Sequence, residues 1–209
     1  MGLLTAVVVA AICVVTGVSG KDLVVRDCTN LTVTSPIITI NNYSFVPYPI
    51  PSPGQLTASL SATLNRPIPA GGLELKVHIR KDVFFWITIN CKNNFGSCDY
   101  DLCDLLSYFE NTTCPQQLID NNIPCTCGTI VPGTYNLINQ VFEIPDVTTI
   151  SSFALGDYQV QFSLVDKVTL EEVYCLHVEL TVKDPNACSG FLCSLFGRRG
   201  IRALWSWLF

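Results

Sequence analysis

Six cysteines lie between residues 91 and 127, and this cluster constrains the fold more than any other feature of the chain. They are Cys91, Cys98, Cys103, Cys114, Cys125 and Cys127. Structural zinc sites favour ligands about two to four residues apart, often with histidine, whereas the gaps here are six, four, ten, ten and one residues and no histidine lies among them. On an extended strand Cys125 and Cys127 would point to the same face, so each is expected to bond to a partner on that side. We therefore interpret the stretch as a disulfide-linked loop and short helix rather than a zinc site.

Residues 1–20 have the features of a secretory signal peptide. Leu3–Val15 is an apolar run too short to span a bilayer, and residues 18–20 offer a cleavage site before Lys21. The segment before the run lacks lysine and arginine, so an uncleaved anchor is the alternative. Passage through the secretory pathway would favour disulfides. Three glycosylation sequons support that route, and they begin at Asn30, Asn42 and Asn111.

Four stretches alternate apolar and polar residues with a period of two, as strands with one apolar face do. Their apolar positions are Leu56, Ala58, Leu60, Ala62 and Leu64, then Leu73, Leu75, Val77 and Ile79, then Tyr158, Val160, Phe162 and Leu164, and finally Tyr174, Leu176, Val178, Leu180 and Val182. Strands do not alternate with helices, which excludes a parallel α/β fold. The 209 residues therefore predict one mostly β domain, an antiparallel sandwich or barrel.

Two segments carry more apolar residues than a two-faced strand or a polar loop needs. Phe84, Phe85 and Trp86 are consecutive aromatics that break the alternation, and the otherwise polar segment 147–156 contains three large apolar residues, Ile150, Phe153 and Leu155. Exposed apolar groups mark interaction sites. Either both faces of the chain are covered at these segments, or the six apolar residues are exposed for an interaction.

The segment Asp99–Phe109 is the one helix expected before the C-terminal tail. Its apolar residues fall at helical spacing, at Leu102, Leu105, Leu106 and Phe109. Asp99 or Asp101 can cap its start, and the apolar stripe is expected to pack in the core.

No catalytic, metal or cofactor site is evident. The two histidines, His78 and His177, fall on polar strand faces, and no nucleophile, zinc-protease or phosphate-loop motif occurs. Three aspartates at 99, 101 and 104 could mimic a glycosidase pair, but their position at a helix start favours capping. A net charge of −5 and a pI of about 4.9 argue against a nucleic-acid partner.

Seven short motifs occur in a fixed order between residues 86 and 158. They are WITINC at 86–91, GSC at 96–98, CDLL at 103–106, CP at 114–115, PCTC at 124–127, GTY at 133–135 and GDY at 156–158. This order resembles the sphingolipid-activator members of the ML lipid-recognition family. The resemblance spans Leu23–Val182 and is strongest from Val83 onward.

The resemblance implies an antiparallel β-cup with one short helix and a large apolar cavity. It implies that the six aromatic and aliphatic residues of the two apolar segments lie at the lipid-contacting rim. It also implies four disulfides, Cys28–Cys175, Cys91–Cys98, Cys103–Cys127 and Cys114–Cys125. Each bridge typically contributes about 2–4 kcal/mol, which would help a hollow fold remain stable.

The function that the resemblance implies is an exchange of lipid and not a reaction. Such a protein takes a glycosphingolipid, a ganglioside or another two-chain lipid, from a membrane surface. It presents the lipid to a soluble β-hexosaminidase-like glycosidase, in the lysosome or outside the cell. Two alternatives are a secreted accessory protein that holds a lipid for a receptor or transfers lipid generally, and a secreted hydrolase with a carboxylate pair in one cleft.

The expected domain order is a signal peptide at 1–20, the lipid-binding domain at 21–183 and an additional tail at 184–209. The tail contains three arginines and two tryptophans, and we expect it to be either disordered or an interfacial helix on a membrane. Cys188 and Cys193 of this tail would either bridge each other or stay free.

Overall fold

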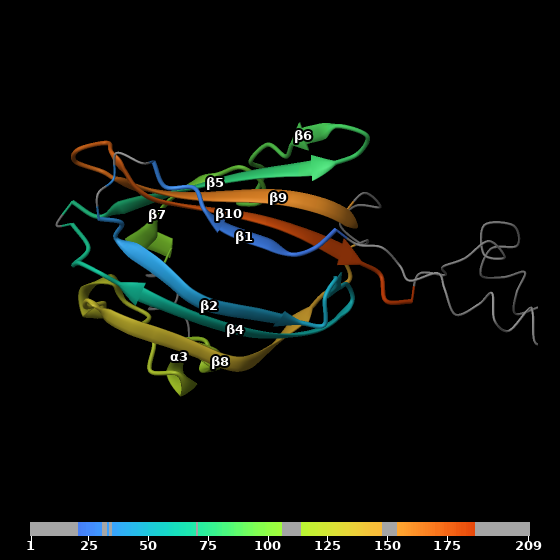
Figure 1. The fold of residues 1–209 in the computed structure, drawn as a ribbon, viewed down its shortest axis with the longest axis horizontal. Helices are drawn as coiled ribbons and strands as arrows, with labels where there is room; N and C mark the ends of the chain where they lie inside the picture. Colours follow the sequence, from blue (N-terminus) through green and yellow to red (C-terminus); the bar gives the residue numbers. More distant parts are fainter. Residues whose placement is uncertain are drawn as a thin grey trace, which may run out of the picture. The chain divides into compact units, whose positions relative to one another are not determined.

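Two antiparallel sheets form the architecture, and Figure 1 shows them as separate layers. The computed structural model describes residues 21–30, 33, 35–69, 71–105, 114–147 and 154–186, and Lys21–Asp184 forms one compact unit. The predicted signal peptide lies outside the described residues, as do residues 187–209 of the tail. None of the helices in the described ranges is long and apolar enough to cross a bilayer.

The large sheet has seven strands and the small sheet has three. The large sheet runs in the order β1 (Val24–Asp27), β10 (Glu172–Lys183), β9 (Gly156–Asp166), β5 (Leu73–Asp82) and β6 (Trp86–Thr88), with β3 (Ile50–Pro51) beside β10 and β7 (Asp99–Asp101) beside β5. The small sheet contains β2 (Ile38–Val46), β4 (Gly54–Leu64) and β8 (Gly133–Ile144). The prediction of a mostly β, antiparallel fold is confirmed; among the strand pairs, β3–β10 is parallel.

The four alternating stretches are β4, β5, β9 and β10, and their apolar residues share the inner faces of the sheets. In the large sheet Leu75 lies opposite Leu164, and Leu176 lies opposite Phe162. Side chains at directly paired positions point to the same face, so the period-two pattern predicted these faces correctly.

A cluster of buried core residues lies at one end of the two sheets, which we call the closed end. Its buried residues are Ile37, Leu64, Leu73, Leu164, Val173 and Tyr174. They come from the first residues of β5 and β10, from the last residues of β4 and β9, and from the residue before β2. At the other end, the open end, β5 finishes and β9 begins, and the inner faces are not filled in this way.

The expected helix at Asp99–Phe109 is wrong at its start. Asp99–Asp101 is the strand β7, which pairs with Glu74–Lys76 of β5, and helical residues begin at Leu102 and are described to Leu105. A helical period within one short segment carries no information about pairing with a strand elsewhere in the chain. The expected cap is correct, since Asp101 Oδ1 accepts hydrogen bonds from the backbone N–H of Cys103 at 2.8 Å and of Asp104 at 3.1 Å. A second, five-residue helix, α3 (Gln116–Asp120), and the 3₁₀ helix η1 (Cys127–Thr129) were not foreseen.

Four disulfides connect the pairs that the resemblance implied. Cys28–Cys175 joins the segment after β1 to β10, and Cys91–Cys98 closes the loop that follows β6. Cys103–Cys127 and Cys114–Cys125 tie the short helix that begins at Leu102, and the residue pair before α3, to the chain that leads into β8. Cys125 and Cys127, which are separated by one residue, therefore bond to different partners and not to each other.

Candidate functional site

An apolar cavity of about 450 Å³ lies on the inner face of the large sheet at the open end. We call it the main cavity. Its lining consists of Ile79, Lys81, Ile87, Ile89, Phe95, Val147, Ala154, Tyr158, Val160, Leu180 and Val182. Ligand pockets are commonly about 300–1,000 Å³ and mostly apolar, so the main cavity has the size and chemistry of a site for an apolar ligand.

Strand register explains why these side chains meet. Lys81 of β5 lies opposite Ile87 of β6 on one side and opposite Tyr158 of β9 on the other, and Tyr158 lies opposite Leu180 of β10. One cross-strand row therefore contributes four lining residues from four strands. A neighbouring row adds Ile79 and Val160, and the alternation of side chains directs both rows to the inner face.

Lys81 is the one charged residue in this lining, and its side chain is nearly enclosed, with 6% of the residue exposed. Its Nζ donates a hydrogen bond to the carbonyl oxygen of Leu155 and lies 4.6 Å from the centroid of the Tyr158 ring. Burial lowers the pKa of Lys81, against a smaller opposing effect of Asp157 and Asp82. The phenol of Tyr158 donates to the carbonyl oxygen of Ala154 at 2.6 Å. Lys81 and Tyr158 therefore anchor the chain where it enters β9.

The hairpin between β5 and β6 carries the most exposed apolar surface at the open end. Asp82 pairs with Trp86, which leaves Val83–Phe85 as a three-residue turn. Phe84 is 99% exposed and Phe85 is 71% exposed, and Phe84 has a backbone φ of 144°, which side-chain-bearing residues adopt only at a cost. The predicted rim residues Phe84 and Phe85 are thus on a tip in solvent.

Trp86, the third predicted aromatic, is only half-exposed because a charged cluster covers it. Lys21 Nζ lies 4.7 Å from the Trp86 ring centroid, 2.9 Å from Asp82 Oδ2 and 3.5 Å from Asp157 Oδ2. The hydrogen bond between Lys21 and Asp82 raises the pKa of Lys21 and lowers the pKa of Asp82. This cluster fixes the base of the hairpin against β9 while its tip stays free.

The loop closed by Cys91–Cys98 supplies a lining residue that the sequence analysis missed. Phe95 lines the main cavity and is still 60% exposed. The loop turns back at Gly96, where φ is 107° and an added Cβ would lie 2.9 Å from the carbonyl carbon of Asn90. A single phenylalanine in a polar loop has no periodic signal, so only the short disulfide loop could have pointed to it.

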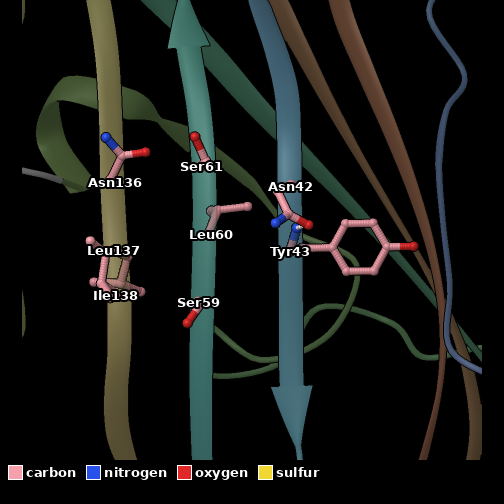
Figure 2. A pocket seen from close by; sticks show the side chains of 8 residues that line it. All are labelled: Asn42, Tyr43, Ser59, Leu60, Ser61, Asn136, Leu137 and Ile138. Carbon is pink, nitrogen blue, oxygen red and sulfur yellow. Dashed lines mark hydrogen bonds between the residues drawn. The ribbon is translucent and has the colours of Figure 1, made fainter.

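Two further cavities lie at the small sheet. One, of about 300 Å³, is lined almost entirely by apolar residues, namely Leu60, Ala62, Leu118, Ile123, Pro124, Ile130, Tyr135 and Leu137. The other, of about 140 Å³, shares Leu60 and Leu137, and Figure 2 shows its lining on the three neighbouring strands β2, β4 and β8. Leu60 lies opposite Tyr43 and is 36% exposed although it lies on the predicted apolar face. The inner face of the small sheet therefore also remains partly unfilled.

The remaining predicted site residues fall in several places. Leu155 is half-buried and contributes the carbonyl bound by Lys81, whereas Ile150, Phe153 and the sequon residue Asn111 lie outside the described residues. Asn42 is exposed on β2 and Asn30 follows β1. His78 is exposed, and His177 lies 3.1 Å from Glu179 in an ion-pair geometry on the outer face of the large sheet.

Residues 22–182 match the family described as the ML domain. The ganglioside GM2 activator of Mus musculus is 32% identical over 126 residues, which cover 58% of this chain and 64% of the mouse protein, just under two thirds of its length. The ganglioside GM2 activator of Macaca fascicularis is 29% identical over 152 residues, covering 69% of this chain and 76% of that protein. A Niemann-Pick type C2 protein from the Japanese carpenter ant superposes with a TM-score of 0.39 at 11% identity, over 77% of this chain and 99% of that one. Because the family match covers more than half of the chain, this protein belongs to the ML domain family.

Proposed function

We propose that this protein is a non-enzymatic lipid carrier that takes a glycosphingolipid, a ganglioside, from a membrane and presents it to a soluble lysosomal glycosidase of the β-hexosaminidase type. The observation that carries the proposal is the main cavity of about 450 Å³ beside the exposed tip of Phe84 and Phe85. The similarity to two ganglioside GM2 activators supports the choice of lipid and of an enzyme partner.

The physical basis is the high cost of exposing acyl chains to water. Each methylene costs about 0.8 kcal/mol, so a lipid with some thirty methylenes would need roughly 20 kcal/mol or more to leave a bilayer unaccompanied. An apolar cavity replaces the bilayer as the solvent of the chains, which makes the net change in free energy small. The two exposed phenylalanines insert first and bring the cavity entrance to the membrane. A sugar headgroup too polar for the cavity remains at its mouth, where a soluble enzyme reaches it.

The proposal includes passage through the secretory pathway to the lysosome or the extracellular space. Four disulfides support this, because they form and persist in oxidising compartments. In this scheme the protein binds the bilayer surface as a peripheral membrane protein, through its exposed rim.

The test combines delipidated protein, vesicles containing ganglioside GM2 and purified β-hexosaminidase, with hydrolysis as the readout. We expect hydrolysis to require both proteins, and soluble ganglioside to appear with the carrier after the vesicles are removed. Lipid uptake without stimulation of the enzyme would instead support a receptor accessory protein, and hydrolysis without added enzyme would support a hydrolase.

Matched substitutions connect the result to the cavity. Val160→Trp places an indole in the main cavity, whereas Val168→Trp places the same group on the β9–β10 turn, where Val168 is 73% exposed. The first is expected to abolish uptake and the second to leave it unchanged. Equal uptake by both variants would contradict the assignment of the cavity.

A further inference from the structure

A lysine occupies an apolar position of β5. Leu73, Leu75, Val77 and Ile79 form the inner face of this strand, and Lys81 is the next residue of the same series. Its cross-strand neighbours Ile87 and Tyr158 also line the main cavity. A charged side chain at 6% exposure among such neighbours costs free energy, so its presence calls for a polar partner.

The partners that the structure gives to Lys81 do not use all of its donors. An ammonium group has three N–H donors, and the contacts of Lys81 Nζ are the carbonyl of Leu155 and the face of the Tyr158 ring. No ion pair joins Lys81 to a carboxylate of the described residues. The nearby Asp82 and Asp157 are both within ion-pair distance of Lys21 instead, at 2.9 Å and 3.5 Å.

We propose that Lys81 is a specificity-determining residue, whose ammonium binds an anionic oxygen, a carboxylate or phosphate oxygen, of a lipid with its acyl chain in the main cavity. The proposal deepens the proposed function and rests on it in one respect, namely that an acyl chain enters this cavity. Tyr158 of β9 and Ala154, whose carbonyl oxygen accepts the hydrogen bond of the Tyr158 phenol, line the same cavity, so the anion would lie where the chain enters β9. A charge-assisted hydrogen bond in such a poorly solvated place is stronger than one between neutral groups.

Three probes of equal chain length separate this proposal from lipid binding in general. They are palmitate, hexadecyl phosphate and hexadecanol, added to the delipidated full chain at neutral pH, with binding measured by equilibrium dialysis. We expect one or both anionic probes to bind about tenfold more tightly than hexadecanol, and their ranking tells whether carboxylate or phosphate is preferred. If all three bind equally, the proposal is overturned while the carrier function stands. If none of the three probes binds, the proposed carrier function is contradicted, and the proposal for Lys81, which rests on it, is overturned with it.

Substitutions then test the residue. Lys81→Met keeps an unbranched side chain of similar length without the charge, and Lys81→Arg keeps the charge. The Met variant is expected to lose the roughly tenfold preference for the anionic probes over hexadecanol, and the Arg variant is expected to retain a preference. A folded Met variant that still prefers the anionic probes would overturn the proposal.

A measurement on the unmodified protein decides the case if the Met variant does not fold. In a crystal structure of the complex with the tighter anionic probe, we expect an anionic oxygen about 3 Å from Lys81 Nζ. An anionic group placed outside the main cavity, or turned away from Lys81, would overturn the proposal whatever the variants do.

Discussion

Replacing Phe84 and Phe85 with serine should separate membrane docking from lipid storage. The two side chains are 99% and 71% exposed, so they contribute little to the packed fold but offer the equivalent of about 1.7 phenylalanine side chains to a bilayer. Burying one such side chain is worth about 1.5–3 kcal/mol, which gives roughly 2.5–5 kcal/mol for complete insertion of the pair. A tenfold change corresponds to about 1.4 kcal/mol. We therefore expect F84S/F85S to weaken vesicle partitioning by at least about tenfold.

The assay is co-sedimentation with neutral phosphatidylcholine vesicles, so that charge does not dominate. The matched control is V168S/L170S, because Val168 and Leu170 are 73% and 76% exposed on the β9–β10 turn at the closed end. Both variants should keep the melting temperature of the wild type within a few degrees, since surface substitutions rarely exceed about 0.5 kcal/mol. The reasoning is refuted if F84S/F85S partitions as the wild type does, or if the control loses as much.

Three other predictions concern stability. Hydrogen bonding by Lys167 lowers the pKa of Asp101, so the stability that this cap provides is present above the usual carboxyl pKa of 3.8 and is lost as the pH falls through the lower folded pKa. In thermal melts D101A should cost about 1 kcal/mol or 2–4 °C at pH 5–7, and much less once the pH is below that lowered pKa. D101N, which keeps a capping oxygen, should cost less than D101A at pH 5–7. Burial raises the pKa of Tyr174 from 10.0 to about 12, so the contribution of the neutral phenol to the free energy of unfolding is complete below pH 10 and declines above it by up to about 1.4 kcal/mol per pH unit. In urea titrations the free energy of unfolding of Y174F should therefore fall less steeply between pH 10 and 12 than that of the wild type, and equal slopes would contradict this. G96A should destabilise the protein by more than about 1 kcal/mol, because the φ of 107° and the backbone of Asn90 both oppose a Cβ; chemical denaturation that finds no loss would show that the loop can shift.

The parts of the fold that sequence could predict are those with a local period. Alternation placed β4, β5, β9 and β10 and their inner faces, because each apolar residue two positions along a strand faces the same way. The start of the helix failed at Asp99–Asp101, where pairing with Glu74–Lys76 depends on a partner about twenty-five residues earlier in the chain.

The candidate site was predictable only in part for the same reason. Three consecutive aromatics at 84–86 are a local anomaly, and two of them are at the exposed tip of the hairpin. Lys81 and Phe95 are single residues, and the importance of each depends on cross-strand rows and a disulfide loop. An apolar series that ends in a lysine two residues beyond Ile79 is the one local signal that could have identified Lys81.

The uneven distribution of packing explains how such a fold tolerates a cavity. At about 24 cal/mol per Å³, an empty and sealed cavity of about 450 Å³ would cost about 11 kcal/mol, which is as large as the whole stability of an ordinary domain. The buried core is concentrated at the closed end, where Cys28–Cys175 lies next to the core residue Tyr174 and Cys103–Cys127 lies next to Leu102, which packs against that core. Cross-links that restrict the unfolded chain stabilise the fold wherever they lie, so they need not fill the open end. The inner faces there are free to be completed by an apolar ligand, and the exposed Leu60 and Phe95 are the surfaces that such a ligand would cover.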